Sequence, residues 1–217
     1  MRSVSLLAAA GFALVTAGAV AVRPTDDEIR RYRWIVAVIF GASAVSYAGI
    51  GLGYGQVDLA TGSVAWLHYA EWLVGTPAYV AGLFLLTEEP HTIRLAVSLD
   101  LLMVGAGIGA ALTSEPARYA LFALATLSLV GLFVLLIDRQ GAEGWRSALY
   151  TDLRRLFLAV GPGYPVVWLL GSEGLGLFGF GVTNFGFLLL DAVVKGGFVV
   201  LFCRARPVDI IVPAWGG

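Results

Sequence analysis

Lys195 is the only lysine in this chain of 217 residues, and it lies in the middle of a long apolar segment. A buried ion pair could use arginine, which stays charged and supplies every other cation of the Lys/Arg class here. A lysine amine differs because it can lose its proton and attack a carbonyl carbon to form a Schiff base. The lone lysine therefore indicates either covalent attachment of a carbonyl compound or an ion pair with a neighbouring acid.

Two acids and a histidine have the spacing to serve this amine. Asp191 precedes Lys195 by four positions, so the two side chains share one face of a helix. Glu71 lies in a different apolar segment, where His68 precedes it by three positions on the same face. A positive charge in surroundings of low dielectric constant loses its proton unless a carboxylate lies nearby. Asp191 supplies one such carboxylate, and Glu71 could supply a second.

The composition of the chain suits lipid rather than water. Hydrophobic residues make up 59% of it and charged residues 13%, whereas a soluble domain usually carries about 25% charge. A membrane helix needs roughly 20 mostly apolar residues. Seven segments meet this requirement: 3–22, 34–54, 66–87, 93–112, 117–137, 153–171 and 179–203. The sequence predicts an all-α bundle of seven transmembrane helices, in a single domain over residues 1–217.

The first segment also has features of a secretory signal. Arg2 precedes an alanine-rich run, and Ala17-Gly18-Ala19 fits the small-residue pattern of a cleavage site. Signal cores are about 7–15 residues long, however, and this run is about 20. We therefore interpret it as a membrane helix.

The arginines predict the orientation in the membrane, because cytoplasmic loops are enriched in basic residues. They gather in the loops after the first, third and fifth segments and in the tail: Arg23, Arg30, Arg31, Arg33, Arg94, Arg139, Arg146, Arg154, Arg155, Arg204 and Arg206. The opposite side has only Arg2 and Arg118. We expect an extracellular N-terminus and a cytoplasmic C-terminus, in a multi-pass protein of the plasma membrane.

Composition also argues against several classes of function. The net charge of −1 gives no reason to expect nucleic acid as a partner. One cysteine, Cys203, allows no intrachain disulfide and no cysteine-based metal cluster. The two histidines, His68 and His91, stand without ligand spacing, so we expect no metal site.

Helical spacing groups further side chains that could line a ligand pocket. The stripes are Trp72 with Thr76 and Tyr79, Asp100 with Met103 and Gly107, Phe122 with Ala125 and Thr126, and Tyr164 with Trp168. Aromatic walls with few polar groups suit a long, flat, conjugated molecule. Ordinary packing of small and aromatic residues between membrane helices would produce the same stripes.

Three motifs stand in register over nearly the whole chain. They are Tyr69-Ala70-Glu71-Trp72-Leu73 with Thr76-Pro77, then Tyr164-Pro165-Val166-Val167-Trp168-Leu169-Leu170-Gly171-Ser172-Glu173-Gly174, then Leu190-Asp191 with Lys195-Gly196. With these motifs the chain resembles the microbial (type 1) rhodopsins, most closely the haloarchaeal bacteriorhodopsin and sensory rhodopsin group. The resemblance implies a light receptor rather than an enzyme.

The same resemblance implies that all-trans retinal is bound covalently to Lys195. It makes Glu71 the primary counterion and proton acceptor, and Asp191 the second counterion. Tyr47 and Tyr164 would then bond to that second counterion. Light isomerises the chromophore of such proteins, and the Schiff base proton moves afterwards. The implied pocket residues are Trp72, Thr76, Met103, Gly107, Phe122, Thr126 and Trp168.

The sequence departs from the proton pumps of that family around Glu71. The pumps have an aspartate there, a threonine where Gly75 stands and an arginine where His68 stands. Their cytoplasmic proton donor is a carboxylate eleven residues after the counterion, where this chain has Gly82. Without a donor the Schiff base recovers its proton slowly, which favours a photosensory role. The alternative is a light-driven outward proton pump of the bacteriorhodopsin type.

Two departures change the shape and the charge of the pocket. A tryptophan that is usual in the family, three residues before Tyr164, is replaced by Gly161. Tyr79, where a leucine is usual, could fill the lost volume, or the space could be open to a second lipid or pigment. His68 titrates near neutrality, so it could make the colour depend on pH, unless it stays neutral and bonded to backbone or water.

The lipid bilayer is the one partner that the composition requires. A membrane signal transducer and a homo-oligomer are compatible with the sequence, although Val194 stands where one sensory subgroup has its signalling threonine. A transporter or scaffold that binds no retinal is a third class of function. The aligned lysine, carboxylates and Tyr164 motif argue against it.

Overall fold

The computed structural model describes residues 2–24, 26–59 and 62–205, and most of these are helical. The helices are α1 (Arg2–Ala21), α2 (Asp27–Leu52), α3 (Trp66–Phe84), α4 (Pro90–Leu112), α5 (Ala117–Asp138), α6 (Trp145–Val160), α7 (Gly163–Leu170) and α8 (Phe180–Ala205), with a short 3₁₀ helix, η1 (Leu85–Thr87), after α3. Arg206, which the orientation prediction used, lies outside the described residues.

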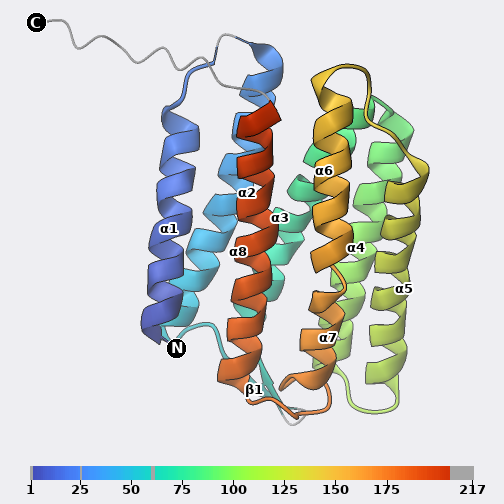
Figure 1. Ribbon diagram of the computed structural model, residues 1–217. Helices are drawn as coiled ribbons and strands as arrows, with labels where there is room; N and C mark the ends of the chain where they lie inside the picture. Colours follow the sequence, from blue (N-terminus) through green and yellow to red (C-terminus); the bar gives the residue numbers. More distant parts are fainter. Residues whose placement is uncertain (1, 25, 60–61, 206–217) are drawn as a thin grey trace, which may run out of the picture.

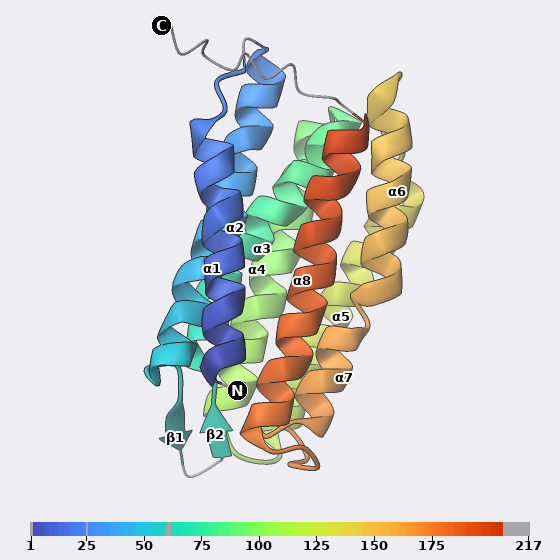
Figure 2. The same ribbon diagram turned by 60° about the vertical axis from the view of Figure 1, so that its left-hand side comes forward.

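The helices run side by side as one bundle (Figure 1). Consecutive helices from α1 to α5 pack against one another, and α6 packs against α8. Both ribbon views show α8 between α1 and α6 (Figures 1 and 2). Among the residues that the structure describes, six helices are long and apolar enough to cross a membrane, and α6 with α7 forms one further span. The predicted seven-span bundle is confirmed at this level.

The two ends of the bundle differ in charge and in the loops and strands that lie there. One end holds the start of α1, the α7–α8 loop and a two-stranded antiparallel hairpin of β1 (Val57–Leu59) and β2 (Gly62–Val64). We call it the hairpin end; the all-α prediction did not include these short strands. The opposite end, which we call the arginine end, holds the α1–α2 and α5–α6 connections and the end of α8. The predicted division of the arginines matches these two ends.

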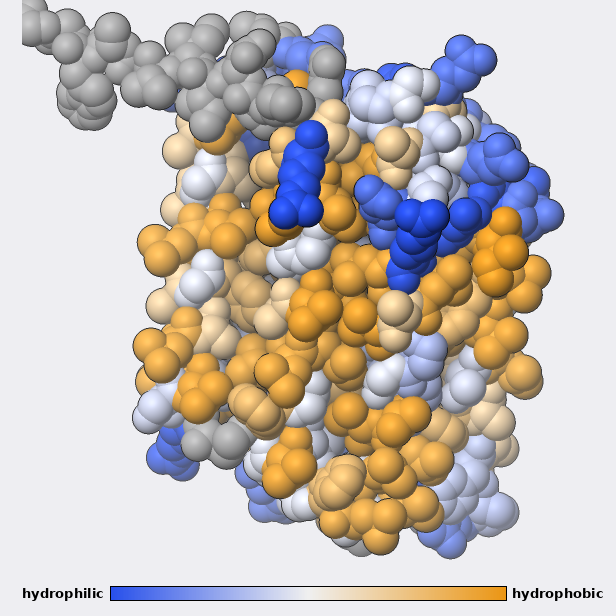
Figure 3. Space-filling model, in the orientation of Figure 1, coloured by the Kyte–Doolittle hydropathy of each residue, from blue (hydrophilic) through white to orange (hydrophobic). Residues whose placement is uncertain are grey.

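Large apolar side chains face outward between the two ends. Leu7 is 73% exposed and Leu14 is 74% exposed on α1, and Val45 on α2 is 71% exposed. Figure 3 shows a broad hydrophobic middle on this face, with hydrophilic residues gathered mostly toward the ends. Such a surface requires lipid around it, since a contiguous apolar patch of this extent is not stable in water.

Two helices begin earlier than their apolar segments predicted. α2 begins at Asp27 rather than at residue 34, and α6 begins at Trp145 rather than at residue 153. The first turn of α2 carries Asp27, Glu28 and Arg30, and residues 145–152 of α6 include Arg146, Asp152 and several uncharged polar residues, so a search for apolar segments missed both stretches. The charges are used: Arg146 donates hydrogen bonds of 2.9 and 2.8 Å to the carboxylate of Glu28, which ties the start of α6 to the start of α2.

The span made by α6 and α7 is interrupted at Gly161 and Pro162. Gly161 N still donates to Phe157 O at 2.8 Å, but the next residue is a proline without an N–H. The helix resumes one turn later with Tyr164 N bonded to Gly161 O at 3.2 Å. The sequence predicted one uninterrupted segment here, 153–171.

Candidate functional site around Lys195

The amine of Lys195 is buried between three helices. Its Nζ lies 2.8 Å from Oε1 of Glu71 on α3, 3.1 Å from Oδ2 of Asp191 on α8 and 2.9 Å from Oγ of Ser43 on α2. All four residues are at most 3% exposed. The structure thus brings together the lysine and the two acids that the sequence singled out, and it adds a hydroxyl.

The two acids are bonded differently. Asp191 accepts hydrogen bonds from Tyr47 OH on Oδ2 and from Tyr164 OH on Oδ1, each at 2.8 Å. Oε1 of Glu71 accepts from Lys195, but Oε2 of Glu71 has no hydrogen-bond partner among the described residues. Both oxygens of Asp191 are therefore held by tyrosine hydroxyls, whereas Oε2 of Glu71 accepts no hydrogen bond from the described residues and can carry a proton.

His68 lies beside this cluster without bonding to Glu71 in the described structure. Its Nε2 lies 3.0 Å from Oδ1 of Asn184, while Nδ1 has no partner among the described residues. The ring stacks on Trp72 at 5.7 Å and meets Tyr47 edge-on at 5.2 Å. Since the amide oxygen only accepts, Nε2 carries the proton, and the neutral ring satisfies this arrangement.

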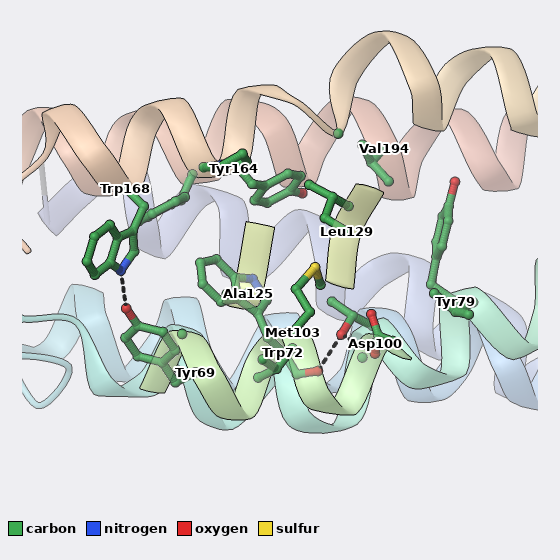
Figure 4. A pocket seen from close by; sticks show the side chains of 18 of the residues that line it. Tyr69, Trp72, Tyr79, Asp100, Met103, Ala125, Leu129, Tyr164, Trp168 and Val194 are labelled. Carbon is green, nitrogen blue, oxygen red and sulfur yellow. Dashed lines mark hydrogen bonds between the residues drawn. The ribbon is translucent and has the colours of Figure 1, made fainter. Parts of the chain in front are cut away.

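A cavity of about 120 Å³ lies between α3, α4, α5, α6, α7 and α8, and Lys195 is among its lining residues (Figure 4). The predicted pocket residues all line it: Lys195, Trp72, Thr76, Tyr79, Met103, Gly107, Phe122, Thr126, Gly161, Tyr164 and Trp168. Figure 4 shows Tyr79 at one end, and Tyr69 with Trp168 at the other. The cavity is therefore elongated, mostly apolar, and supplied with one amine.

Aromatic rings form the walls of this cavity. Phe122 and Trp168 stack with centroids 4.7 Å apart and 13° between their planes. Trp72 meets Phe187 edge-on at 5.0 Å. The lining also includes a polar pair, in which Thr76 Oγ1 donates to Asp100 Oδ2 at 2.9 Å. A flat hydrophobic molecule fits between such walls.

Gly161 lines the cavity, and a ring of α5 lies close to it. A Cβ placed on Gly161 would lie 2.9 Å from Cζ of Phe133. Tyr79 stacks on Phe157 instead, with centroids 5.7 Å apart, and its hydroxyl has no hydrogen-bond partner among the described residues. Phe133 is thus the aromatic ring closest to Gly161. Tyr79 packs instead against Phe157, which precedes Gly161 by four positions in the α6–α7 span.

A chain of hydrogen bonds leads from the cavity to the hairpin end. Trp168 Nε1 donates to Tyr69 OH at 2.7 Å, and Tyr69 OH donates to Oε2 of Glu173. Oε1 of Glu173 accepts from the backbone N–H of Ala65 at 3.0 Å. Burial raises the pKa of the Glu173 carboxyl, and the hydrogen bonds oppose that shift in part. Thr183, in the first turn of α8, accepts a hydrogen bond from Ser172 N in the preceding loop at 3.1 Å.

Sequence reasoning missed Ser43, Asn184 and Phe133. Ser43 precedes Tyr47 by four positions, so the two share a helix face, and that spacing could have revealed it. Asn184 is a buried amide in an apolar helix, which is a signal of a polar partner. Phe133 carries no comparable signal, because a phenylalanine in a membrane helix is ordinary.

Comparison with known proteins gives consistent matches over the whole bundle. Residues 1–207 match the family model described as "Bacteriorhodopsin-like protein". The chain is 32% identical over 196 residues to archaerhodopsin-2 of Halobacterium sp. (strain aus-2), covering 85% of this chain and 76% of that protein. It is 32% identical over 202 residues to bacteriorhodopsin-I of Haloarcula marismortui, covering 85% and 80%. The crystal structure of a thermophilic rhodopsin from Rubrobacter xylanophilus matches with a TM-score of 0.81 and 26% identity, covering 95% of this chain and 96% of that one.

Proposed function

The chain belongs to the bacteriorhodopsin-like family of microbial rhodopsins, which are retinal-binding, light-driven membrane proteins, and we propose that Lys195 holds all-trans retinal in a photosensory receptor. The observation that carries this proposal is the contact of Lys195 Nζ with Glu71 and Asp191 in the lining of an elongated aromatic cavity. The site is buried, so the charge on the nitrogen depends on these two acids.

The described residues fit this cofactor in shape and in chemistry. The cavity is lined by Lys195 and by Trp72, Met103, Phe122 and Trp168, where a linear polyene and its ring have apolar contacts. When bound, retinal is a Schiff base of the lysine and supplies absorption of visible light and isomerisation. Everything else at the site is a property of the protein's own side chains.

The two acids have different roles in this proposal. Glu71 lies 2.8 Å from Nζ and has an oxygen without a partner in the described chain, so it can accept a proton from that nitrogen. Asp191 keeps its negative charge because Tyr47 and Tyr164 donate to both of its oxygens. Glu71 thus takes the proton, while the charge of Asp191 keeps the electrostatic potential at Nζ negative.

On the arginine-end side of Nζ the buried acid Asp100 of α4 is bonded to Thr76 and not to Lys195. α3 has no acid after Glu71, and a Cβ on Gly82 would lie 3.0 Å from Ile35 and 3.2 Å from Phe198. This apolar region supports slow reprotonation, and hence a long-lived state suited to signalling. We infer that the hairpin end is extracellular, since the arginines gather at the other end. A membrane transducer and a homo-oligomer stay predictions.

An outward proton pump is the second candidate function. It is favoured by one observation, namely an acid rather than a neutral residue beside Nζ. The two functions differ in net transport: a pump acidifies the medium around illuminated cells, and a receptor of this kind does not do so at a comparable rate.

Addition of all-trans retinal to the purified apoprotein tests the proposal. We expect a coloured species that illumination with hydroxylamine bleaches, and a mass increase on Lys195 after borohydride reduction. Lys195→Arg keeps the buried charge but cannot form the imine, so it should fold and stay colourless. An uncoloured wild-type protein that is folded would contradict retinal binding. Light-induced acidification that an uncoupler abolishes would select the pump.

A further inference from the structure

Ser43 bridges the amine and the acid of the site. Its Oγ accepts a hydrogen bond from Lys195 Nζ at 2.9 Å and lies 3.2 Å from Oε1 of Glu71. It also lies 3.0 Å from the carbonyl oxygen of Ile39, one turn earlier on α2. The residue has no exposed surface. A single hydroxyl proton is therefore shared between a backbone carbonyl and the Glu71 carboxylate.

Gly75 makes the position of the Glu71 carboxylate possible. Gly75 follows Glu71 by four positions on α3, on the same face of the helix. A Cβ built on Gly75 would overlap Oε1 of Glu71. The carboxylate thus occupies the volume that a side chain at position 75 would take. Ser43 contacts the same oxygen from the neighbouring helix.

We propose that Ser43 is a positioning residue which, together with the missing side chain of Gly75, holds Oε1 of Glu71 against the nitrogen of Lys195. The proposal deepens the function proposed above and rests on it for its relevance to light. The hydroxyl of Ser43 stabilises the ionised form of Glu71, and the absence of a side chain at Gly75 leaves room for the longer side chain of a glutamate. Removal of either feature moves the carboxylate relative to the nitrogen.

The alternative is that Ser43 has only a packing role. Serines in membrane helices commonly bond to the carbonyl four residues earlier, as Ser43 does to Ile39. Ser46 provides a matched control because it is also buried on α2, but its hydroxyl donates to the backbone oxygen of Leu67 at 3.0 Å. A packing role predicts similar effects for both serines.

The lone lysine gives a direct measurement in the apoprotein. Growth with [ζ-15N]lysine produces a single side-chain nitrogen resonance, that of Lys195. We expect Ser43→Ala to shift this resonance and the pH at which it titrates, Ser43→Thr to restore both, and Ser46→Ala to change neither. An unchanged resonance in folded Ser43→Ala, or equal shifts in both alanine variants, would overturn the proposal.

A second measurement tests the role of Gly75 and does not depend on Ser43→Ala folding. Gly75→Ala should shift the Lys195 resonance because it displaces the Glu71 carboxylate. Glu71→Asp withdraws the carboxylate by one methylene, so a Cβ at position 75 no longer displaces it. The double variant Glu71→Asp/Gly75→Ala should therefore show a smaller shift of the Lys195 resonance than the sum of the shifts in the two single variants. Additive shifts would overturn the proposal. Both measurements use the apoprotein, so a failure to bind retinal would contradict the proposed function without affecting this test.

Discussion

Tyr47 of α2 donates a 2.8 Å hydrogen bond to Oδ2 of Asp191 on α8, across 144 positions of sequence. Both side chains are buried, so the bond links two helices inside the bundle. Hydrogen bonds to charged groups contribute about 1.5–3 kcal/mol. We expect Tyr47→Phe to lower the free energy of unfolding by about this amount, and to shift the absorption maximum of the retinal-loaded protein because the carboxylate field changes.

Tyr32→Phe is the matched control for this prediction. Tyr32 is equally buried on α2, but its hydroxyl donates to the neutral backbone oxygen of Gly82 at 3.0 Å. Loss of a neutral hydrogen bond costs about 0.5–1.5 kcal/mol, and the colour should not change. Denaturant titration and absorption spectra measure the two quantities. Identical spectra for Tyr47→Phe and wild type would contradict a role of this tyrosine at the site.

The region beside Gly161 gives a second prediction. Tyr79 lines the cavity and stacks on Phe157, and Phe133 lies nearest to the glycine. Truncation of a buried aromatic ring leaves a cavity and removes contacts with the ligand. We expect Tyr79→Leu to loosen retinal binding and to raise the rate of thermal bleaching, measured as loss of colour at a fixed temperature.

Phe133→Leu separates the two residues that compete for this space. If Phe133 alone fills the volume beside Gly161, Phe133→Leu should bleach faster than Tyr79→Leu. If Tyr79 fills it, the order is reversed. No change in bleaching for Tyr79→Leu would refute its part in holding the ligand.

Glu173 predicts a pH dependence of stability. Burial raises its pKa above the ordinary value of 4.5, so the folded protein holds this proton more tightly than the unfolded chain. The resulting stabilisation is complete below the pKa that Glu173 has in the unfolded chain. It is lost as the pH rises through the higher pKa that Glu173 has in the folded protein. Glu173→Gln should therefore flatten the decrease of the melting temperature with rising pH.

Asp58 on β1 gives a comparison of opposite sign. Hydrogen bonds from Ser63 and Gln56 lower the pKa of this exposed carboxyl. Its contribution is present above the unfolded pKa and is lost as the pH falls, so Asp58→Asn should not flatten the decrease at higher pH. Melting temperatures of the three proteins from about pH 4 to about pH 8 test this. Equal slopes for wild type and Glu173→Gln would contradict the prediction.

The sequence predicted those parts of the site that depend on helix periodicity or on the resemblance. Asp191 and Lys195 share a face because of their spacing, and the structure places them 3.1 Å apart. The contact of Glu71 with that pair joins two helices, and spacing within one helix could not predict it. Motif register over the chain supplied this expectation.

Other parts depend on packing between helices, which no local pattern records. The spacing of Ser43 from Tyr47 places both on one face of α2, but Ser43 reaches Lys195 only because α2 packs against α8. The position of Phe133 against Gly161 depends in the same way on how α5 packs against the broken α6–α7 span. The early start of α6 was missed for a different reason. Arg146 in its first turn makes this stretch too polar for a search for apolar segments, but the residue forms an ion pair with Glu28 of α2.

Gly82 allows a direct test of why proton return should be slow. It lies on α3 eleven residues after Glu71, among apolar side chains of α2 and α8. Gly82→Asp introduces a carboxyl group on the arginine-end side of Lys195, and a positioned acid accelerates proton transfer by on the order of 10²-fold or more. We expect faster recovery of the resting absorption after a flash. Gly82→Asn has nearly the same shape, so it meets the same contacts with Ile35 and Phe198 but cannot donate an acid proton. Equal recovery rates for the aspartate and asparagine variants would show that proton supply from this side does not limit the cycle.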